Sequence, residues 1–132
     1  MIIIVLFVGI YMDSYETDKW ISDLFFDYFD PCPFNPIWTQ GVDIDGLELN
    51  WEKYKKIFIN PPYSNPMPWA LKAIETKQKN PNHIIVMLLK NDSSTRYYRA
   101  LHEHGSEFLF PYGRLKYRSG HSAPFSSVLV IL

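Results

Sequence analysis

Two short apolar runs, each ending in a polar residue, constrain the fold of this chain more than any other feature. The run "KKIFIN" ends at Asn60, and the run "HIIVMLLK" ends at Lys90. The core of the second run is continuously apolar, which is typical of a central strand in a parallel sheet. Between them, "PWALKAIETKQKN" indicates a helix that accepts Pro68 in its first turn. This order of strand, helix and strand predicts an α/β sheet.

A helix and a short strand are expected before this unit. The segment "TDKWISDLFFDYF" places apolar residues at helical spacing, and Thr17 or Asp18 can cap its start. A brief strand then ends at Asp30, because the prolines of "PCPFNPIW" exclude a helix beyond it. Further along, "VDIDGLELNW" contains an Asp-Gly turn signal.

The second half of the chain adds a helix and a closing set of strands. The segment "SSTRYYRALHEHG" predicts a helix that Asp92 or Ser93 caps and Gly105 ends. Residues 107–132 predict two or three strands with glycine turns between them.

Polar side chains at three expected strand ends mark a candidate site. Asp30 ends the first strand, Asn60 ends the second, and residues 90–92 (Lys-Asn-Asp) end the third. Ligands of α/β sheets bind at the carboxyl ends of the strands. These groups are therefore expected to gather at one edge of the sheet.

Length and composition indicate one globular domain in a reducing compartment. The chain has 132 residues, of which 47% are apolar, and its single cysteine, Cys32, cannot form an internal disulfide. We therefore expect a cytoplasmic protein. The opening "MIIIVLFVGIYM" lacks a basic leading region and is too short to span a bilayer, so no membrane association is expected. Residues 1–12 either form a buried strand or are a start-site artefact before Met12, and residues 13–132 form the expected domain.

Charge is distributed unevenly along the chain. Residues 1–66 carry 4 Lys and Arg against 10 Asp and Glu, whereas residues 67–132 carry 9 against 4. This asymmetry suggests a polyanionic partner for the surface that the second half builds. The alternative is that the fold interleaves the two halves and the charges average out.

The four residues after the first apolar run, Asn-Pro-Pro-Tyr at positions 60–63, indicate a specific chemistry. The prolines keep the backbone extended and leave the Pro61 carbonyl outside any helical turn. The Asn60 side-chain oxygen and this carbonyl can then act as two neighbouring acceptors, with the ring of Tyr63 beside them. A planar group with an exocyclic NH2 fits this arrangement, because the acceptors take both hydrogens and the ring stacks on the plane.

Accepting both hydrogens explains how such an amine can be alkylated. The lone pair of an amino group on an aromatic base is delocalised, and accepting both hydrogens bends the nitrogen toward tetrahedral geometry. An electrophilic methyl group placed in line can then be attacked, helped by positioning and by stabilisation of the growing positive charge. No strong general base is required, because the product ammonium loses its proton readily.

This motif and further blocks resemble the small phage and viral DNA N6-adenine methyltransferases, which use S-adenosylmethionine. In order, the blocks are "YET", "DPCP", "DGLELNW", "FINPPYS", "MLLKND", and "GRLKY" followed by "APFSSVLVIL". The resemblance runs from about Tyr15 to the end of the chain. It implies a compact and truncated single-domain Rossmann-like methyltransferase fold. It also implies DNA as partner, S-adenosylmethionine as cofactor and, for a viral protein, the cytoplasm of the host cell.

The resemblance also assigns roles to individual residues. The catalytic set, which would receive a flipped adenine, is Asn60, Pro61, Pro62 and Tyr63. The cofactor set, expected near the methionine, ribose or adenosine portions, is Asp30, Pro31, Asp45 and Thr17. The substrate set, expected to face the base or its phosphates, is Arg114, Lys116 and Ser64. No metal site is expected, because the two histidines of "HEH" would point in different directions on a helix.

Three departures and alternatives bear on these roles. Thr17 matches a Thr-Pro pair of the family, but Asp18 stands here in place of the proline. The glycine-rich cofactor loop of larger methyltransferases is absent, and "DPCP" takes its place. Asp30 and Asp45 are equally compatible with ordinary turn or capping aspartates.

Other substrates and an inactive relative remain as alternatives. The same motif occurs in enzymes that methylate cytosine N4 or protein glutamine, and adenine in RNA is a further amine of this type. The shortened cofactor region is also compatible with a DNA-binding relative that has lost catalysis.

A target base in duplex DNA must be flipped out, at a cost of a few kcal/mol that backbone contacts offset. The cations available for those contacts are Arg96, Arg99, Arg114, Lys116 and Arg118. No separate segment is available for base readout. We therefore expect low sequence specificity, or specificity supplied by a short loop or by a second subunit in a homodimer.

Overall fold

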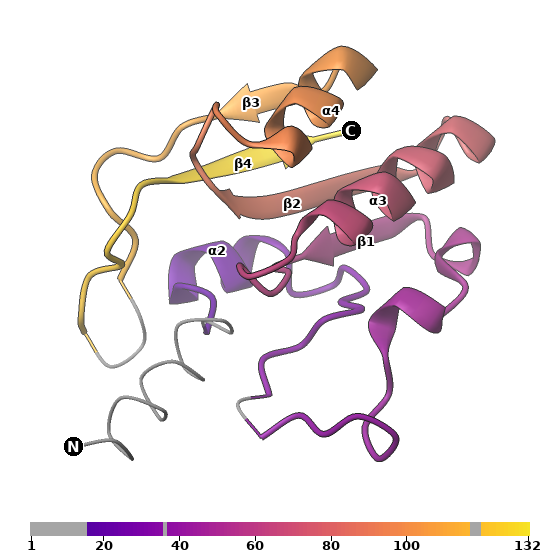
Figure 1. The fold of residues 1–132 in the computed structure, drawn as a ribbon, viewed down its shortest axis with the longest axis horizontal. Coiled ribbons are helices and arrows are strands. Elements are labelled where there is room, and N and C mark those ends of the chain that lie inside the picture. The colour runs from indigo at the N-terminus through magenta and orange to yellow at the C-terminus, as the bar shows by residue number, and fades with distance from the viewer. Residues whose placement is uncertain (1–15, 36, 117–119) are drawn as a thin grey trace.

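A four-stranded mixed sheet forms the centre of the molecule. The computed structural model describes residues 16–35, 37–116 and 120–132. The sheet has the order β1-β2-β4-β3. Its strands are β1 (Lys56–Ile59), β2 (Ile84–Lys90), β3 (Glu107–Leu109) and β4 (Ser127–Ile131). β1 and β2 are parallel, whereas β4 lies between β2 and β3 and is antiparallel to both (Figure 1). The expected α/β class is confirmed, and the expectation for residues 1–12 lies outside the described residues.

Three α-helices and two 3-10 turns accompany the sheet within the described ranges. The helices are α2 (Lys19–Leu24), α3 (Met67–Lys79) and α4 (Arg96–His104), and the turns are η1 (Gly46–Glu48) and η2 (Trp51–Lys53). α3 connects the parallel pair β1 and β2, as the sequence predicts, and has Pro68 in its first turn. Among the described helices, none has the length and apolar character needed to cross a bilayer.

The expected strand before Asp30 is present as a single bridge. Phe29 pairs in parallel with Ile57 of β1. Its N–H donates to the Lys56 carbonyl at 2.9 Å, and its own carbonyl accepts from the Phe58 N–H at 2.9 Å. The chain at residue 29 therefore runs in the same direction as β1 and delivers Asp30 to the same edge of the sheet as Asn60.

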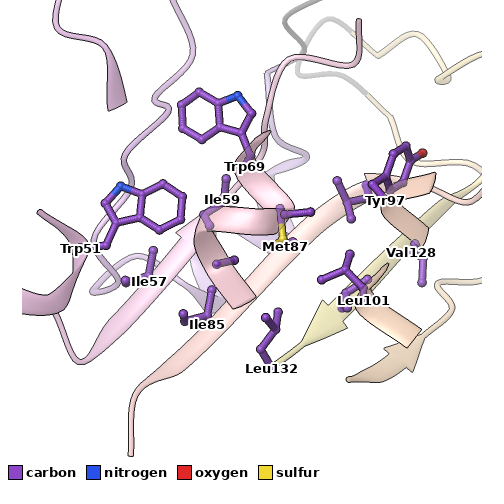
Figure 2. Close-up of a cluster of buried hydrophobic side chains, with 14 residues drawn as sticks. Trp51, Ile57, Ile59, Trp69, Ile85, Met87, Tyr97, Leu101, Val128 and Leu132 are labelled. Carbon is purple, nitrogen blue, oxygen red and sulfur yellow. The ribbon is translucent and has the colours of Figure 1, made fainter. Parts of the chain in front are cut away.

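Side chains of β2 alternate between two apolar layers. Ile85, Met87 and Leu89 join one buried cluster with residues of α3 and α4. Figure 2 labels Ile85 and Met87 within this cluster. Val86 and Leu88 face the other way and pack with Ile21 of α2. Burial of one aliphatic side chain stabilises the folded state by about 1.5–3 kcal/mol. Because β2 buries side chains on both of its faces, it connects the two apolar layers. This two-sided burial explains why its sequence is continuously apolar.

The start of α4 differs from the sequence prediction. Thr95, rather than Asp92 or Ser93, occupies the N-cap position. The Asp92 carboxylate instead accepts from the Ser94 backbone N–H at 3.1 Å and from the Ser94 hydroxyl. Asp92 thus closes a turn before the helix, and this competing local bond explains why the helix begins later. Gly105 ends the helix as expected, with a positive φ of 91°.

A close backbone contact joins the segment after the first strand to the segment before η1. A Cβ added at Gly46 would lie 1.8 Å from the Pro31 carbonyl oxygen and 2.9 Å from the Trp69 ring. The Gly46 carbonyl also accepts from Trp51 Nε1 at 2.9 Å. Only glycine allows this approach, and the contact brings the "DPCP" and "DGLELNW" segments together.

Gly46→Ala is expected to lower the free energy of unfolding by about 3 kcal/mol or more, because the added methyl group overlaps the Pro31 backbone. Urea unfolding measures this loss. Gly41→Ala is the matched control, since Gly41 has a φ of 81° but nothing within 4 Å of an added Cβ. This control is expected to lose only about 1–2 kcal/mol, from backbone strain. Equal losses in the two variants would contradict the close contact.

Candidate active site

The candidate site lies at the carboxyl ends of the parallel strands. Asp30 follows the Phe29 bridge, Asn60 follows β1, and Lys90 is the last residue of β2. Since these strands run in the same direction, their ends lie at one edge of the sheet (Figure 1). The predicted gathering of these strand ends is confirmed.

The side chain of Asn60 is held by hydrogen bonds on both sides of its amide. Its Nδ2 donates to Thr17 Oγ1 at 3.0 Å. Its Oδ1 accepts from the Tyr63 hydroxyl at 3.1 Å. Thr17 therefore fixes the NH2 side of the amide and directs the oxygen toward Tyr63.

A small cavity adjoins this amide. Its volume is about 20 Å³, which is room for about one water molecule. Residues of its wall come from distant parts of the chain, and they include Thr17, Asn60, Tyr63, Leu115, Lys116 and Phe125. A purine ring is far larger than one water, so the cavity must widen before it can accept a base.

Phe125 is a member of this wall that the sequence analysis did not assign. Its ring meets the Tyr63 ring edge to face, with centroids 5.0 Å apart and an interplanar angle of 72°. Lys90 Nζ lies 6.0 Å from the Phe125 centroid, in cation–π geometry. Phe125 lies just before β4, and β4 pairs with β2. The aromatic residue in "APF", separated from the last apolar run by two serines, was the available signal.

Asp18 connects the start of α2 to the other wall of the cavity. Its Oδ2 accepts from the Lys116 backbone N–H at 2.8 Å. Asp18 has the N-cap position, as the sequence allowed, but its side chain makes no capping bond. The predicted cap is therefore wrong for the side chain, because a long-range donor takes its place.

The predicted substrate residues do not all reach the cavity. Lys116 lines it, and its backbone forms an antiparallel bridge with Ser122. Arg114 is exposed on the surface two residues before Lys116, and Ser64 is exposed in the loop after the Asn-Pro-Pro-Tyr motif. Neither of these two lines the cavity. Their roles in DNA contact stay predictions.

The predicted cofactor residues form a separate group, apart from Thr17. The Asp30 carboxylate accepts from the Cys32 N–H at 2.8 Å, and the Asp45 carboxylate accepts from the Leu47 N–H at 2.9 Å. Asp45 thereby caps η1. Pro31 contacts Gly46, so the two aspartates lie on segments in direct contact. Both aspartates have a local turn role in this structure, and their binding roles stay predictions.

The environment of Asp30 changes its acidity. Although the residue as a whole is exposed, burial of its carboxyl group raises its pKa above the ordinary value. The hydrogen bond from the Cys32 N–H lowers the pKa and offsets part of this rise. A nearby cation would stabilise the ionised form of such a carboxyl group.

The sequence profile of a family described as DNA N-6-adenine-methyltransferase (Dam) matches residues 39–127, well over half of the chain. The chain belongs to this family. The range matched by the Dam family includes residues 60–63, Lys116 and Phe125, whereas Thr17 and Asp30 precede it. The resemblance found from the sequence motifs is thereby confirmed at the level of the family.

Two phage proteins of the same description are similar to the chain. A DNA N-6-adenine-methyltransferase of Escherichia phage T1 is 38% identical over 64 residues, which are 48% of this chain and 26% of that protein. One of Haemophilus phage HP1 (strain HP1c1) is 34% identical over 64 residues, 48% of this chain and 36% of that protein. The match thus spans well under half the length of either relative. No solved structure matches the chain significantly.

The raised pKa of Asp30 predicts how stability depends on pH. The folded protein binds the Asp30 proton more tightly than the unfolded chain does. The contribution of Asp30 to the free energy of unfolding is therefore full below the unfolded pKa and is lost as pH rises through the folded pKa. Asp30→Asn removes this titration, so the variant is expected to gain stability relative to the wild type as pH rises through that window. Urea unfolding from about pH 3 to pH 7 measures the difference, and parallel profiles would contradict it.

Proposed function

We propose that the protein transfers a methyl group from S-adenosylmethionine to the N6 amine of adenine in DNA. The cavity at the end of β1 carries this proposal, because it joins an oriented amide oxygen of Asn60 to the rings of Tyr63 and Phe125. Membership of the Dam family supports both the reaction and the substrate.

The sheet supports a compact Rossmann-like methyltransferase fold. Phe29, β1 and β2 provide parallel strand ends, and α3 makes the crossover between β1 and β2. The antiparallel β4 is inserted between β2 and β3. Between residues 31 and 55, the described residues form short 3-10 turns as their only helices and form no strand, which fits a truncated form of such a fold.

The residues around Asp30 fit S-adenosylmethionine by their charge. The cofactor carries a sulfonium, an ammonium and ribose hydroxyls, and these are partners for carboxylate oxygens. Asp30 and Asp45 would hold it from the two segments that meet at Pro31 and Gly46. When bound, the cofactor supplies an electrophilic methyl carbon.

Asn60 would bind the amine through its side-chain oxygen. The base amine replaces the Tyr63 hydroxyl as the donor to Asn60 Oδ1, which Thr17 keeps in place. The oxygen then stabilises the positive charge that grows on the amine nitrogen. The rings of Tyr63 and Phe125 offer apolar surfaces for the flipped base.

Exposed cations would hold the DNA backbone around this pocket. Lys90 and Lys116 adjoin the pocket itself, and Arg114 lies near it in sequence. Arg96 and Arg99 lie on α4, where Arg99 also pairs with Glu103 at 2.9 Å. These contacts are independent of base sequence. We therefore keep the expectation of low sequence specificity, with a short loop or the second subunit of a homodimer as the alternative source of base readout.

Labelled methyl transfer tests the proposal and separates its alternatives. The protein is incubated with methyl-labelled S-adenosylmethionine and DNA, RNA or protein, and the modified nucleosides are identified by mass spectrometry. N6-methyladenine in DNA is the expected product. Label in N4-methylcytosine, in RNA or in glutamine would instead identify that amine as the substrate. DNA binding with no cofactor binding in calorimetry would identify an inactive relative.

Asn60→Ala is expected to lower turnover by about 10²- to 10³-fold, comparable with losing one preorganised electrostatic group in an active site. Cofactor affinity, measured by calorimetry, should stay nearly unchanged. Asn65→Ala is the matched control, because Asn65 is exposed in the same loop. Equal activity of Asn60→Ala and wild type would refute the role of Asn60.

Tyr63→Phe and Tyr63→Ala separate the hydroxyl group from the ring. Phenylalanine keeps the stacking surface and removes the donor that competes with the base amine for Asn60 Oδ1. Its turnover should equal or exceed that of the wild type. Alanine should weaken binding of DNA by about 1–3 kcal/mol, the usual value for an aromatic stack on a base. Fluorescence anisotropy and steady-state rates measure the pair, and equal defects in both variants would contradict this division.

A further inference from the structure

Asp18 uses its side chain in an unusual way for its position. An aspartate at an N-cap ordinarily accepts an N–H from the first turn of its own helix. In α2 the Asp18 backbone carbonyl accepts from the Ile21 and Ser22 N–H groups, both at 3.0 Å, but the side chain makes no capping bond. Instead, Oδ2 accepts from the Lys116 N–H at 2.8 Å, across 98 positions of sequence. A charge-assisted bond of this length is among the stronger hydrogen bonds of proteins.

The neighbouring residue binds the opposite wall of the same cavity. Thr17 Oγ1 accepts from Asn60 Nδ2 at 3.0 Å. The consecutive residues Thr17 and Asp18 therefore connect the Asn60 wall to the Lys116 wall. Both walls line the 20 Å³ cavity.

Backbone hydrogen bonds join the residues of the Lys116 wall. Lys116 and Ser122 form an antiparallel bridge, and the Ala123 N–H donates to the Leu115 carbonyl at 2.7 Å. Leu115 and Ala123 are buried and line the cavity. A restraint on the Lys116 backbone therefore also restrains the apolar side of the pocket.

We propose that Asp18 is a positioning residue that sets the width of the base pocket by holding the Lys116 backbone at a fixed distance from Asn60. This proposal rests on the proposed function, because the pocket it adjusts is the one assigned to the flipped adenine. The pocket must widen to admit a base, and residues 17 and 18 decide how far its two walls can separate. Asp18 thereby couples the DNA contact of Lys116 to the seating of the base at Asn60.

Three variants test this role, each measured in the full chain. Asp18→Ala removes the acceptor, whereas Asp18→Asn keeps an oxygen in the same place. Asp23→Ala is the matched control, because Asp23 is also on α2 and forms an exposed ion pair with Lys19. Four quantities are measured: amide hydrogen exchange at Lys116 in the free protein, DNA affinity, the steady-state constants for DNA, and cofactor affinity.

In Asp18→Ala the Lys116 amide should exchange about tenfold faster or more, as expected for the loss of a hydrogen bond to a charged group. The KM for DNA should rise by a similar factor, and the dissociation constant of S-adenosylmethionine should stay unchanged. Asp18→Asn should restore most of the protection of the Lys116 amide and should bring the KM for DNA most of the way back to the wild-type value. Asp23→Ala should behave like the wild type.

Unchanged exchange at Lys116 in Asp18→Ala would overturn the proposal. So would a parallel loss of cofactor affinity and DNA affinity, because that pattern shows a general structural role. Failure of the wild type to methylate DNA would instead refute the proposed function. In that case hydrogen exchange and DNA affinity still decide whether Asp18 holds the Lys116 wall.

Discussion

The orientation of one amide, that of Asn60, is the constraint on which the candidate site depends. A free asparagine side chain can rotate and can present either its oxygen or its nitrogen. Here Thr17 accepts from the nitrogen and Tyr63 donates to the oxygen, so the oxygen faces the Tyr63 hydroxyl beside the cavity that both residues line. Preorganised groups of this kind cost no reorganisation when charge develops on a substrate. Pro61 and Pro62, which follow, restrict the backbone next to Asn60.

The sheet places the two sides of the pocket within reach of this amide. β1 delivers Asn60 to the edge where the parallel strands end. β4 runs in the opposite direction beside β2, so the start of β4 lies at the same edge as the end of β2. Ser127 pairs with Lys90 there, and Phe125 lies two residues earlier in the chain. An all-parallel sheet would have put that aromatic residue at the far edge.

A second contact organises the side assigned to the cofactor. Gly46 lies against the Pro31 backbone so closely that no side chain fits between them. Asp30 directly precedes Pro31 and Asp45 directly precedes Gly46, and each carboxylate accepts a backbone N–H two residues further on. These bonds orient the carboxylates without help from a glycine-rich loop. A few close contacts therefore replace the longer connections that a larger domain would use.

Sequence analysis predicted the parts of the molecule that local patterns control. The apolar runs gave β1 and β2, and the helical spacing gave α3, because burial on one or both faces imposes a period on the sequence. Capping was predicted less well. Asp92 closes a turn and Asp18 reaches Lys116, since a short polar side chain takes whichever donor the folded chain brings nearest. Phe125 was missed because a lone aromatic residue before a strand has no local pattern that separates a pocket wall from a core.

By itself the sequence determined the family, the parallel unit of β1, α3 and β2, and the Asn-Pro-Pro-Tyr turn at the end of β1. Each of these follows from neighbouring residues, whose spacing and backbone restrictions act over a few positions. Only the tertiary structure decided that Thr17 holds Asn60, that Phe125 faces Tyr63 and that Asp18 binds Lys116. Thr17 lies 43 positions from Asn60 and Asp18 lies 98 from Lys116, so these contacts arise from packing of the whole chain.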